Sequence, residues 1–229
     1  MKNYASDNVK LSHIRSGSIP KMIHVSNRSY TYPTDADGKM YPIKLIESQS
    51  TANKSFASVY GSSNDQNSQN KMTVLSIGGN DIKDKVVTML LGGVDGLMTS
   101  VVNQEFVNEY ETVIRNLKRT TGKIVLVSIY LPYLGPGSSY AMFAGQAKPV
   151  MKRWHSFLHK LAAKHNIPIL DLSKTLDPYN RSHYGTDIIY LSNTSSSCVA
   201  KCIQYIYDNY DGYHIYYAPD CSVKNIKCD

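Results

Sequence analysis

Residues 73–82, with the sequence TVLSIGGNDI, constrain the fold of this chain more than any other stretch. The stretch opens with an apolar, partly β-branched run, which is typical of a strand covered on both faces. Two glycines follow, and they allow a sharp backbone turn where a side chain would clash. Ligands of open α/β sheets bind just beyond the carboxyl ends of the strands. We therefore expect Asn80 and Asp81, which come next, to lie at a site, although an ordinary strand-to-loop turn would produce the same pattern.

The rest of the chain alternates between strand-like and helix-like patterns. Short apolar runs predict strands at residues 21–25, 56–60, 123–130 and 167–172, and a helical period predicts helices at 103–119, about 150–161 and about 195–206. The connections between strands are long enough for crossover helices, which favours a parallel sheet with helices on both faces. The predicted fold class is therefore α/β, a three-layer α/β/α sandwich around a central, mostly parallel sheet.

The length of 229 residues suits one domain, or one domain with an appendage. We divide the chain into a polar N-terminal arm at residues 1–20, an α/β domain at residues 21–210 and a C-terminal tail at residues 211–229. The tail contains tyrosines and cysteines, and its sequence predicts no element.

The formal net charge of +7 suggests an acidic partner, but the lysines and arginines are scattered without a dense cluster. This distribution favours a solvated basic surface over a nucleic-acid site. No run approaches the roughly 18 apolar residues of a membrane span. The first residues are polar and lack the apolar centre of a signal peptide, so the expected location is intracellular by default, unless a leader was removed. The sequence leaves the oligomeric state open.

All four cysteines fall late in the chain, at Cys198, Cys202, Cys221 and Cys228. Their spacing is not a recognised zinc pattern, and no nearby histidine completes one, so we expect no metal and no cofactor. Cys198 and Cys202 are one helical turn apart and could both face the core. Alternatively, disulfides could tie the tail cysteines back to that helix, which would indicate an oxidising setting. The sequence leaves both possibilities open.

Two features between residues 131 and 165 bear on function. Residues 131–145 contain two prolines and three glycines, which predicts a long surface loop that could act as a substrate lid. In the helix that follows, His155 and His159 lie off the apolar face. We interpret both as surface residues rather than metal ligands.

Three predicted strands end in loops that carry three different residue types. Ser29 offers a hydroxyl, Gly61 an unobstructed backbone N–H and Asn80 a side-chain amide. A hydroxyl nucleophile flanked by N–H donors is what acyl transfer requires, because the donors stabilise the oxyanion of the tetrahedral intermediate. A fourth loop carries His183 and Asp187.

These residues resemble the SGNH or GDSL-type esterases and lipases, a family named for Ser, Gly, Asn and His in four separated blocks. The sequence IGGND is similar to the family's Gly-x-Asn-Asp block, and the likeness extends over about residues 21–207. The corresponding segments are residues 23–31 with Ser29, 56–63 with Gly61, 77–81 with Asn80, and 187–192 with Asp187.

The resemblance implies a flavodoxin-like sandwich and hydrolysis of an ester through an acyl-Ser29 intermediate. It implies an oxyanion hole made of the Ser29 N–H, the Gly61 N–H and the Asn80 side chain, with Asp187 orienting the base. The substrate would be a small-molecule ester or an acylated carbohydrate or lipid, without a cofactor.

Two departures from the family pattern matter. The Gly and Asp before the nucleophile are Asn27 and Arg28 here, and Tyr190 occupies the position of the catalytic histidine. A phenol with a pKa near 10 cannot take the serine proton as imidazole does. Losing a triad histidine costs roughly a factor of 10⁶ in turnover. His183 is the main candidate to replace it, because Gly185 makes the loop between His183 and Asp187 flexible. The alternative interpretation of His183 is a surface loop residue. His24, which lies within a predicted strand, is a weaker candidate.

The sequence leaves two hypotheses from different classes. The first is an SGNH-type ester hydrolase, favoured by the retained Ser29, Gly61, Asn80 and Asp187. The second is a catalytically degenerate relative that keeps the fold for a binding or structural role, favoured by Tyr190. A flavodoxin-like nucleotide binder would need a Gly-rich phosphate loop after the first strand, which the sequence lacks.

Overall fold

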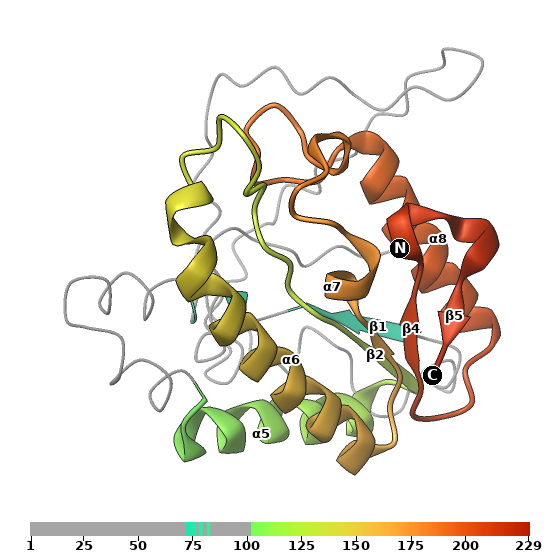
Figure 1. Ribbon diagram of the computed structural model, residues 1–229. Helices are drawn as coiled ribbons and strands as arrows, with labels where there is room; N and C mark the ends of the chain where they lie inside the picture. Colours follow the sequence, from blue (N-terminus) through green and yellow to red (C-terminus); the bar gives the residue numbers. More distant parts are fainter. Residues whose placement is uncertain (1–71, 77, 80–81, 83–101) are drawn as a thin grey trace, which may run out of the picture.

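The computed structural model of the chain describes residues 72–76, 78–79, 82 and 102–229 (Figure 1). The predicted arm and the predicted strands at 21–25 and 56–60 lie outside the described residues, as do Ser29, Gly61 and Asn80. The helices are α5 (Gln104–Thr120), α6 (Ala144–His165), α7 (Leu172–Thr175) and α8 (Asn193–Asp208), with short 3-10 turns η2 (Ala141–Phe143), η3 (Arg181–His183), η4 (Pro219–Cys221) and η5 (Val223–Asn225). The strands are β1 (Met72–Leu75), β2 (Lys123–Val127), β3 (Ile169–Leu170), β4 (Ile215–Tyr217) and β5 (Lys227–Cys228).

The described strands form one five-stranded, mostly parallel sheet in the order β1-β2-β3-β4-β5. The first four strands are parallel, and β5 runs antiparallel to β4. A row of partners crosses the sheet from Val127 to Leu170, Tyr216 and Cys228. Because parallel strands point the same way, the carboxyl ends of β1, β2 and β3 meet at one edge. The coarse prediction of an α/β fold with a mostly parallel sheet is confirmed.

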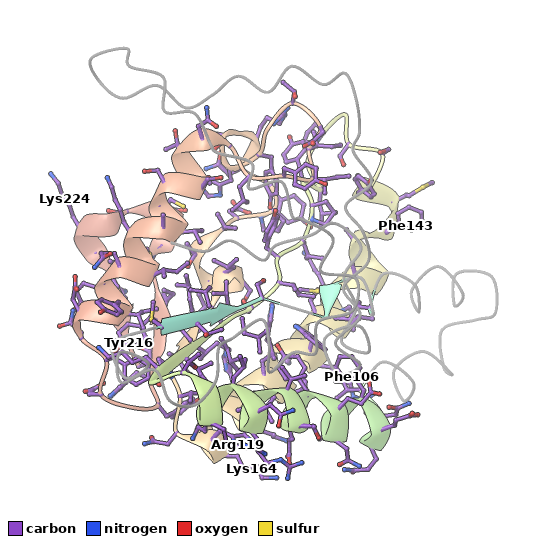
Figure 2. All side chains as sticks on the ribbon, turned by 180° about the vertical axis from the view of Figure 1, so that it is seen from behind. Phe106, Arg119, Phe143, Lys164, Tyr216 and Lys224 are labelled. Atoms are coloured by element: carbon purple, nitrogen blue, oxygen red, sulfur yellow. The ribbon has the colours of Figure 1, made fainter. Side chains whose placement is uncertain are left out.

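Two apolar clusters hold the helices to the sheet. The first joins α5 and α6 to Ile124, Leu126 and Ile169. The second joins α7 and α8 to Val125, Val127 and Leu170, which alternate with the residues of the first cluster along β2 and β3. Successive side chains of a strand point to opposite faces, so β2 contributes to both clusters in alternation. Their separation is visible in Figure 2, where Phe106 of the first cluster and Tyr216 of the second lie on opposite sides of the view.

The predicted helix at 103–119 is confirmed as α5. Asn103 is its N-cap, and its side chain accepts a hydrogen bond from the Phe106 N–H at 2.9 Å, which satisfies one of the open donors at the helix start. Lys118 and Arg119 lie in the last turn, where positive charge is favourable.

The prediction of a surface loop at residues 131–145 is only partly correct. The 3-10 turn η2 and the start of α6 occupy residues 141–145, and Tyr133, Leu134 and Gly135 are buried. Pro149 lies near the N-terminus of α6, and the helix nevertheless begins at Ala144. The helix predicted at about 195–206 is confirmed as α8.

The C-terminal tail completes the sheet. Its strand β4 pairs with β3, and Tyr216 and Ala218 are buried in the second apolar cluster. Tail residues 215–228 therefore share a core with the α/β domain instead of standing apart from it. Among the described helices, none combines the length and apolar character needed to cross a membrane.

Candidate functional site

The Gly-Gly turn lies at the carboxyl end of β1, as predicted. Gly78 has φ +104°, a conformation that residues with a Cβ rarely adopt. The turn opens a helical segment, because the Ile82 N–H donates to the Gly78 carbonyl at 2.9 Å. The indole of Trp154, which is fully buried, packs so close to Gly78 that a Cβ there would overlap the ring. This turn immediately precedes Asn80 in the sequence.

The segment after β2 lies against this turn. A Cβ on Gly79 would meet Cγ2 of Ile129 at 3.5 Å, so the ends of β1 and β2 are adjacent. The Ile129 carbonyl is 3.0 Å from Nε2 of His155 on α6. The next residue, Tyr130, is close to the fourth predicted loop. Burial and, to a smaller extent, the charges of Asp187 and Tyr190 together raise the pKa of its hydroxyl to about 12.

The loop at residues 184–191 is a tight, hydrogen-bonded turn around Asp187. Oδ1 of Asp187 accepts hydrogen bonds from the N–H groups of Ile189 at 3.2 Å and Tyr190 at 3.0 Å. The Gly185 N–H donates to the Tyr190 carbonyl at 2.8 Å and closes the turn. Ile188 has φ +58°, which is an outlier for a β-branched residue and marks backbone strain. Strain of this kind persists only where the surroundings enforce it.

The segment after β2 supplies that enforcement. The Tyr133 N–H donates to the carbonyl of the strained Ile188 at 2.9 Å, and the Leu134 N–H donates to the Pro178 carbonyl at 2.7 Å. The Tyr184 hydroxyl donates to the Leu131 carbonyl at 3.0 Å. The residues predicted as a substrate lid are therefore fixed at 131 and 133 to the Asp187 loop, and at 134 to the Pro178 carbonyl.

His183 is buried in the turn η3, with 4% of its surface exposed. The interpretation of His183 as a surface histidine is therefore wrong. Its Nδ1 accepts a hydrogen bond from the Asp177 N–H at 3.0 Å, and its Nε2 lies 3.4 Å from the Asn180 amide nitrogen. In a neutral imidazole only one ring nitrogen has a free lone pair, and here that lone pair is occupied. The role of His183 as a replacement base stays a prediction, and it requires this turn to open.

Tyr190 lies beside Asp187 with 57% of its surface exposed. It occupies the position at which the resemblance expects the catalytic histidine. Of the predicted site residues, the structure thus brings together Asp187 and Tyr190, close to Tyr130. It keeps the His183 ring hydrogen-bonded within its own turn.

A second polar group lies at the carboxyl end of β3, and the sequence analysis missed it. Asp171, which is 2% exposed, accepts hydrogen bonds from the N–H and the hydroxyl of Ser173 at 2.9 and 2.6 Å. Nε2 of His159 lies 3.1 Å from Oδ2 of Asp171, an ion-pair distance without well-aligned hydrogen-bond geometry. Burial raises the pKa of Asp171, but the contacts with His159 and Ser173 outweigh it and hold that pKa well below its usual range.

This pair corrects the interpretation of His155 and His159 as surface residues. Both side chains are half-buried, and both have partners at the carboxyl edge of the sheet. Their spacing of four residues places them on one face of α6. An aspartate directly after a predicted strand was the signal that could have indicated the pairing.

The described residues contain no group of three or more His, Cys, Asp or Glu side chains placed to hold a metal ion. They do form a half-open pocket of about 250 Å³ lined by Lys118, Ile124, Asn166 and Tyr210, among others. This pocket lies at the amino ends of β2 and β3, so it is separate from the Asp187 loop. Comparisons with protein-family models, curated proteins and solved structures found no match for this chain.

Proposed function

We propose that the protein is an SGNH-type ester hydrolase with a three-layer α/β/α sandwich, in which Ser29 forms the acyl-enzyme intermediate. The observation that carries the proposal is the strained Asp187 loop, which is fixed to the segment after β2 at the carboxyl edge of the sheet. The Gly78 turn, which leads into Asn80, ends β1 at that same edge. Ligands of parallel α/β sheets bind at this edge.

The local geometry of Asp187 suits the role of orienting a base. Its Oδ1 is used by two backbone N–H groups, which hold the carboxylate in place. Within the part of the chain that the structure describes, its Oδ2 accepts no hydrogen bond, and the residue is exposed. A fixed, solvent-facing carboxylate oxygen can orient an imidazole and stabilise the cation that forms during proton transfer.

The alternative is a catalytically degenerate SGNH-type protein that binds an ester or acylated ligand without turning it over. Two observations favour this second candidate. Tyr190 stands in the position of the family's histidine, and a phenol, with an ordinary pKa near 10, is a poor general base at neutral pH. The lone pair of His183 is occupied by the Asp177 N–H.

Labelling with a fluorophosphonate probe separates the two candidates. The probe reacts with a serine whose proton is removed by a base, so the hydrolase is expected to be labelled and its Ser29→Ala variant is not. The binding protein is expected to remain unlabelled until Tyr190→His restores an imidazole beside Asp187. Tyr179→His is the matched control, because Tyr179 is also an exposed tyrosine of the 177–192 segment but does not contact Asp187 in the structure.

The base is identified by one further variant, His183→Gln, compared with Tyr190→His. If His183 serves as the base after its turn opens, His183→Gln is expected to weaken labelling. The melting temperature of this variant measures how far the loss of the buried His183 contacts disturbs the fold. If labelling appears only in Tyr190→His, the oxyanion site is intact and lacks its base. If no variant is labelled, Ser29 is not a nucleophile and the hydrolase proposal fails.

A further inference from the structure

A cluster of three thiols lies between α8 and the tail, apart from the candidate site. Cys198 and Cys202 are buried on α8, and Cys221 is half-buried at the end of η4. All three pack in the second apolar cluster. Electrostatic interactions among the three thiols accompany this packing, and that with Cys198 contributes to raising the pKa of Cys221. All four cysteines of the chain are free.

The geometry selects one pair from this cluster. Cys198 and Cys202 are four residues apart on one helix, where Cβ atoms are about 5–6 Å apart. A disulfide needs Cβ atoms about 3.5–4.5 Å apart, so a bond along the helix would distort it. Cys221 approaches from a different element and packs against the cluster that contains both helix thiols, so this limit does not apply to it. Of the two helix thiols, Cys198 is the one whose interaction raises the pKa of Cys221. The exposed Cys228 lies on β5, where it is the strand partner of Tyr216.

We propose that Cys198 and Cys221 form a redox-controlled disulfide that ties η4 to α8, with a low-molecular-weight disulfide such as oxidised glutathione as the oxidant. The Cys221 thiolate, which is the more accessible of the pair, attacks a sulfur of the oxidant and releases one glutathione thiol. The Cys198 thiolate then attacks the Cys221 sulfur of the mixed disulfide and releases the second. Two protein thiols are oxidised, and one oxidant disulfide is reduced to two thiols.

The turn that carries Cys221 explains what the bond would do. Asp220 and Cys221 have consecutive positive φ values of 51° and 56°, which residues with a Cβ rarely adopt. This turn follows β4 directly, and in the reduced state it is held to α8 by packing in the second apolar cluster. A Cys198–Cys221 bond would make that attachment covalent and restrict the opening of the tail.

Burial sets the speed of this reaction. Burial and the contact with Cys198 raise the pKa of the Cys221 thiol to about 12. The thiolate is the attacking species, so the rate of bond formation is expected to rise about tenfold per pH unit through the neutral range. The bond should therefore form slowly at neutral pH and faster in mild alkali.

The test starts from the fully reduced chain, incubated with oxidised glutathione at about pH 7 and about pH 9. Free thiols are then alkylated in denaturant, and the protein is analysed by intact mass and by peptide mapping without reductant. We expect one linked peptide pair to contain Cys198 and Cys221, with Cys202 alkylated; the exposed Cys228 is either alkylated or carries a glutathione. Cys221→Ser abolishes the link, and Cys228→Ser, which removes the exposed tail thiol, leaves it unchanged.

Three results would overturn the proposal. These are a linked peptide that contains Cys228 or Cys202 in place of either partner, a glutathione that stays on Cys221 without a protein link, and four free thiols after incubation at about pH 9. Peptide mapping of the chain without substitutions decides among these results. A variant that fails to fold therefore does not affect the outcome. None of these results depends on whether Ser29 is a nucleophile.

Discussion

Gly78 combines two constraints, and only one of them is visible in the sequence. The Gly-Gly pair after an apolar run predicts a sharp turn, and the φ of +104° confirms it. The contact with the Trp154 indole comes from α6, more than seventy residues later in the chain, and no local pattern contains it. Glycine is required here both by the backbone conformation and by the ring that fills the space of a side chain.

Gly78→Ala is therefore expected to lower the free energy of unfolding by about 3 kcal/mol, since the strained φ costs about 1–2 kcal/mol and the overlap with Trp154 adds a similar amount. Chemical denaturation measures the change. Gly137→Ala is the matched control, because Gly137 also has a positive φ, +79°, but has no atom near the position of a Cβ. Its expected cost is about 1 kcal/mol. Equal costs for the two variants would show that the Trp154 contact is unimportant.

At the level of single residues, the candidate site was only partly predictable from the sequence. The sequence indicated Asp187 as a member of a polar loop, and the structure places it in a turn with an exposed carboxylate. The burial of His183 was not predictable, because its partners Asp177 and Asn180 are short-range residues in a turn without a regular period. Whether Ser29, Gly61 and Asn80 join this edge stays a prediction, since they lie outside the described residues.

At the scale of elements, the pairing of His159 with Asp171 links α6 to the start of α7. Asp171 is the N-cap of α7 through the Ser173 N–H, and it meets α6 through His159. One buried carboxylate thus holds two helices at the carboxyl end of β3. Periodicity predicted the helix that carries His159, but the partner of an off-face histidine depends on which strand end lies beneath it.

Asp171→Asn is expected to lower the free energy of unfolding by about 1–3 kcal/mol at neutral pH, because asparagine keeps the helix cap but loses the charged contact with His159. The folded pKa of Asp171 is below its unfolded value. Its contribution is therefore fully present above the unfolded pKa, near 3.9, and is lost as the pH falls through the lower folded pKa.

Denaturation curves between about pH 7 and pH 2 measure this effect. The difference between the native protein and Asp171→Asn should be largest at neutral pH and should shrink below about pH 4. Asp177→Asn serves as a control, because Asp177 is an exposed carboxylate that also accepts a backbone N–H; its expected change is within about 0.5 kcal/mol. A difference that stays constant with pH would contradict the assignment.

For the whole molecule, the tail decides how the described sheet ends. Strand β5 pairs with the outer edge of β4, and Ile215 and Asp229 exchange two backbone hydrogen bonds at 2.9 and 3.0 Å. The Asp229 carboxylate also pairs with Lys174 at 2.9 Å. An uncovered strand edge presents unpaired N–H and C=O groups to other chains, so β5 protects β4 from pairing between molecules.

Deletion of residues 226–229 is therefore expected to cause concentration-dependent self-association beyond that of the full chain. Size-exclusion chromatography with light scattering measures the mass. Lys174→Ala is the control, because it removes the surface ion pair, which contributes about 0–1 kcal/mol, and leaves β5 in place. If the shortened and full chains show the same mass at every concentration, β5 does not protect this edge.

The sequence by itself determined the elements whose patterns are local: the Gly-Gly turn after β1, the long helices α5, α6 and α8, and the mostly parallel α/β sheet. Hydrophobic period and turn residues specify these elements because they act within a few residues. Only the tertiary structure decided that the Tyr-rich tail supplies β4 and β5, that His159 meets Asp171, and that Cys221 meets Cys198. Each of these contacts joins residues ten or more positions apart in the chain. Their approach depends on how the two apolar clusters close around the sheet.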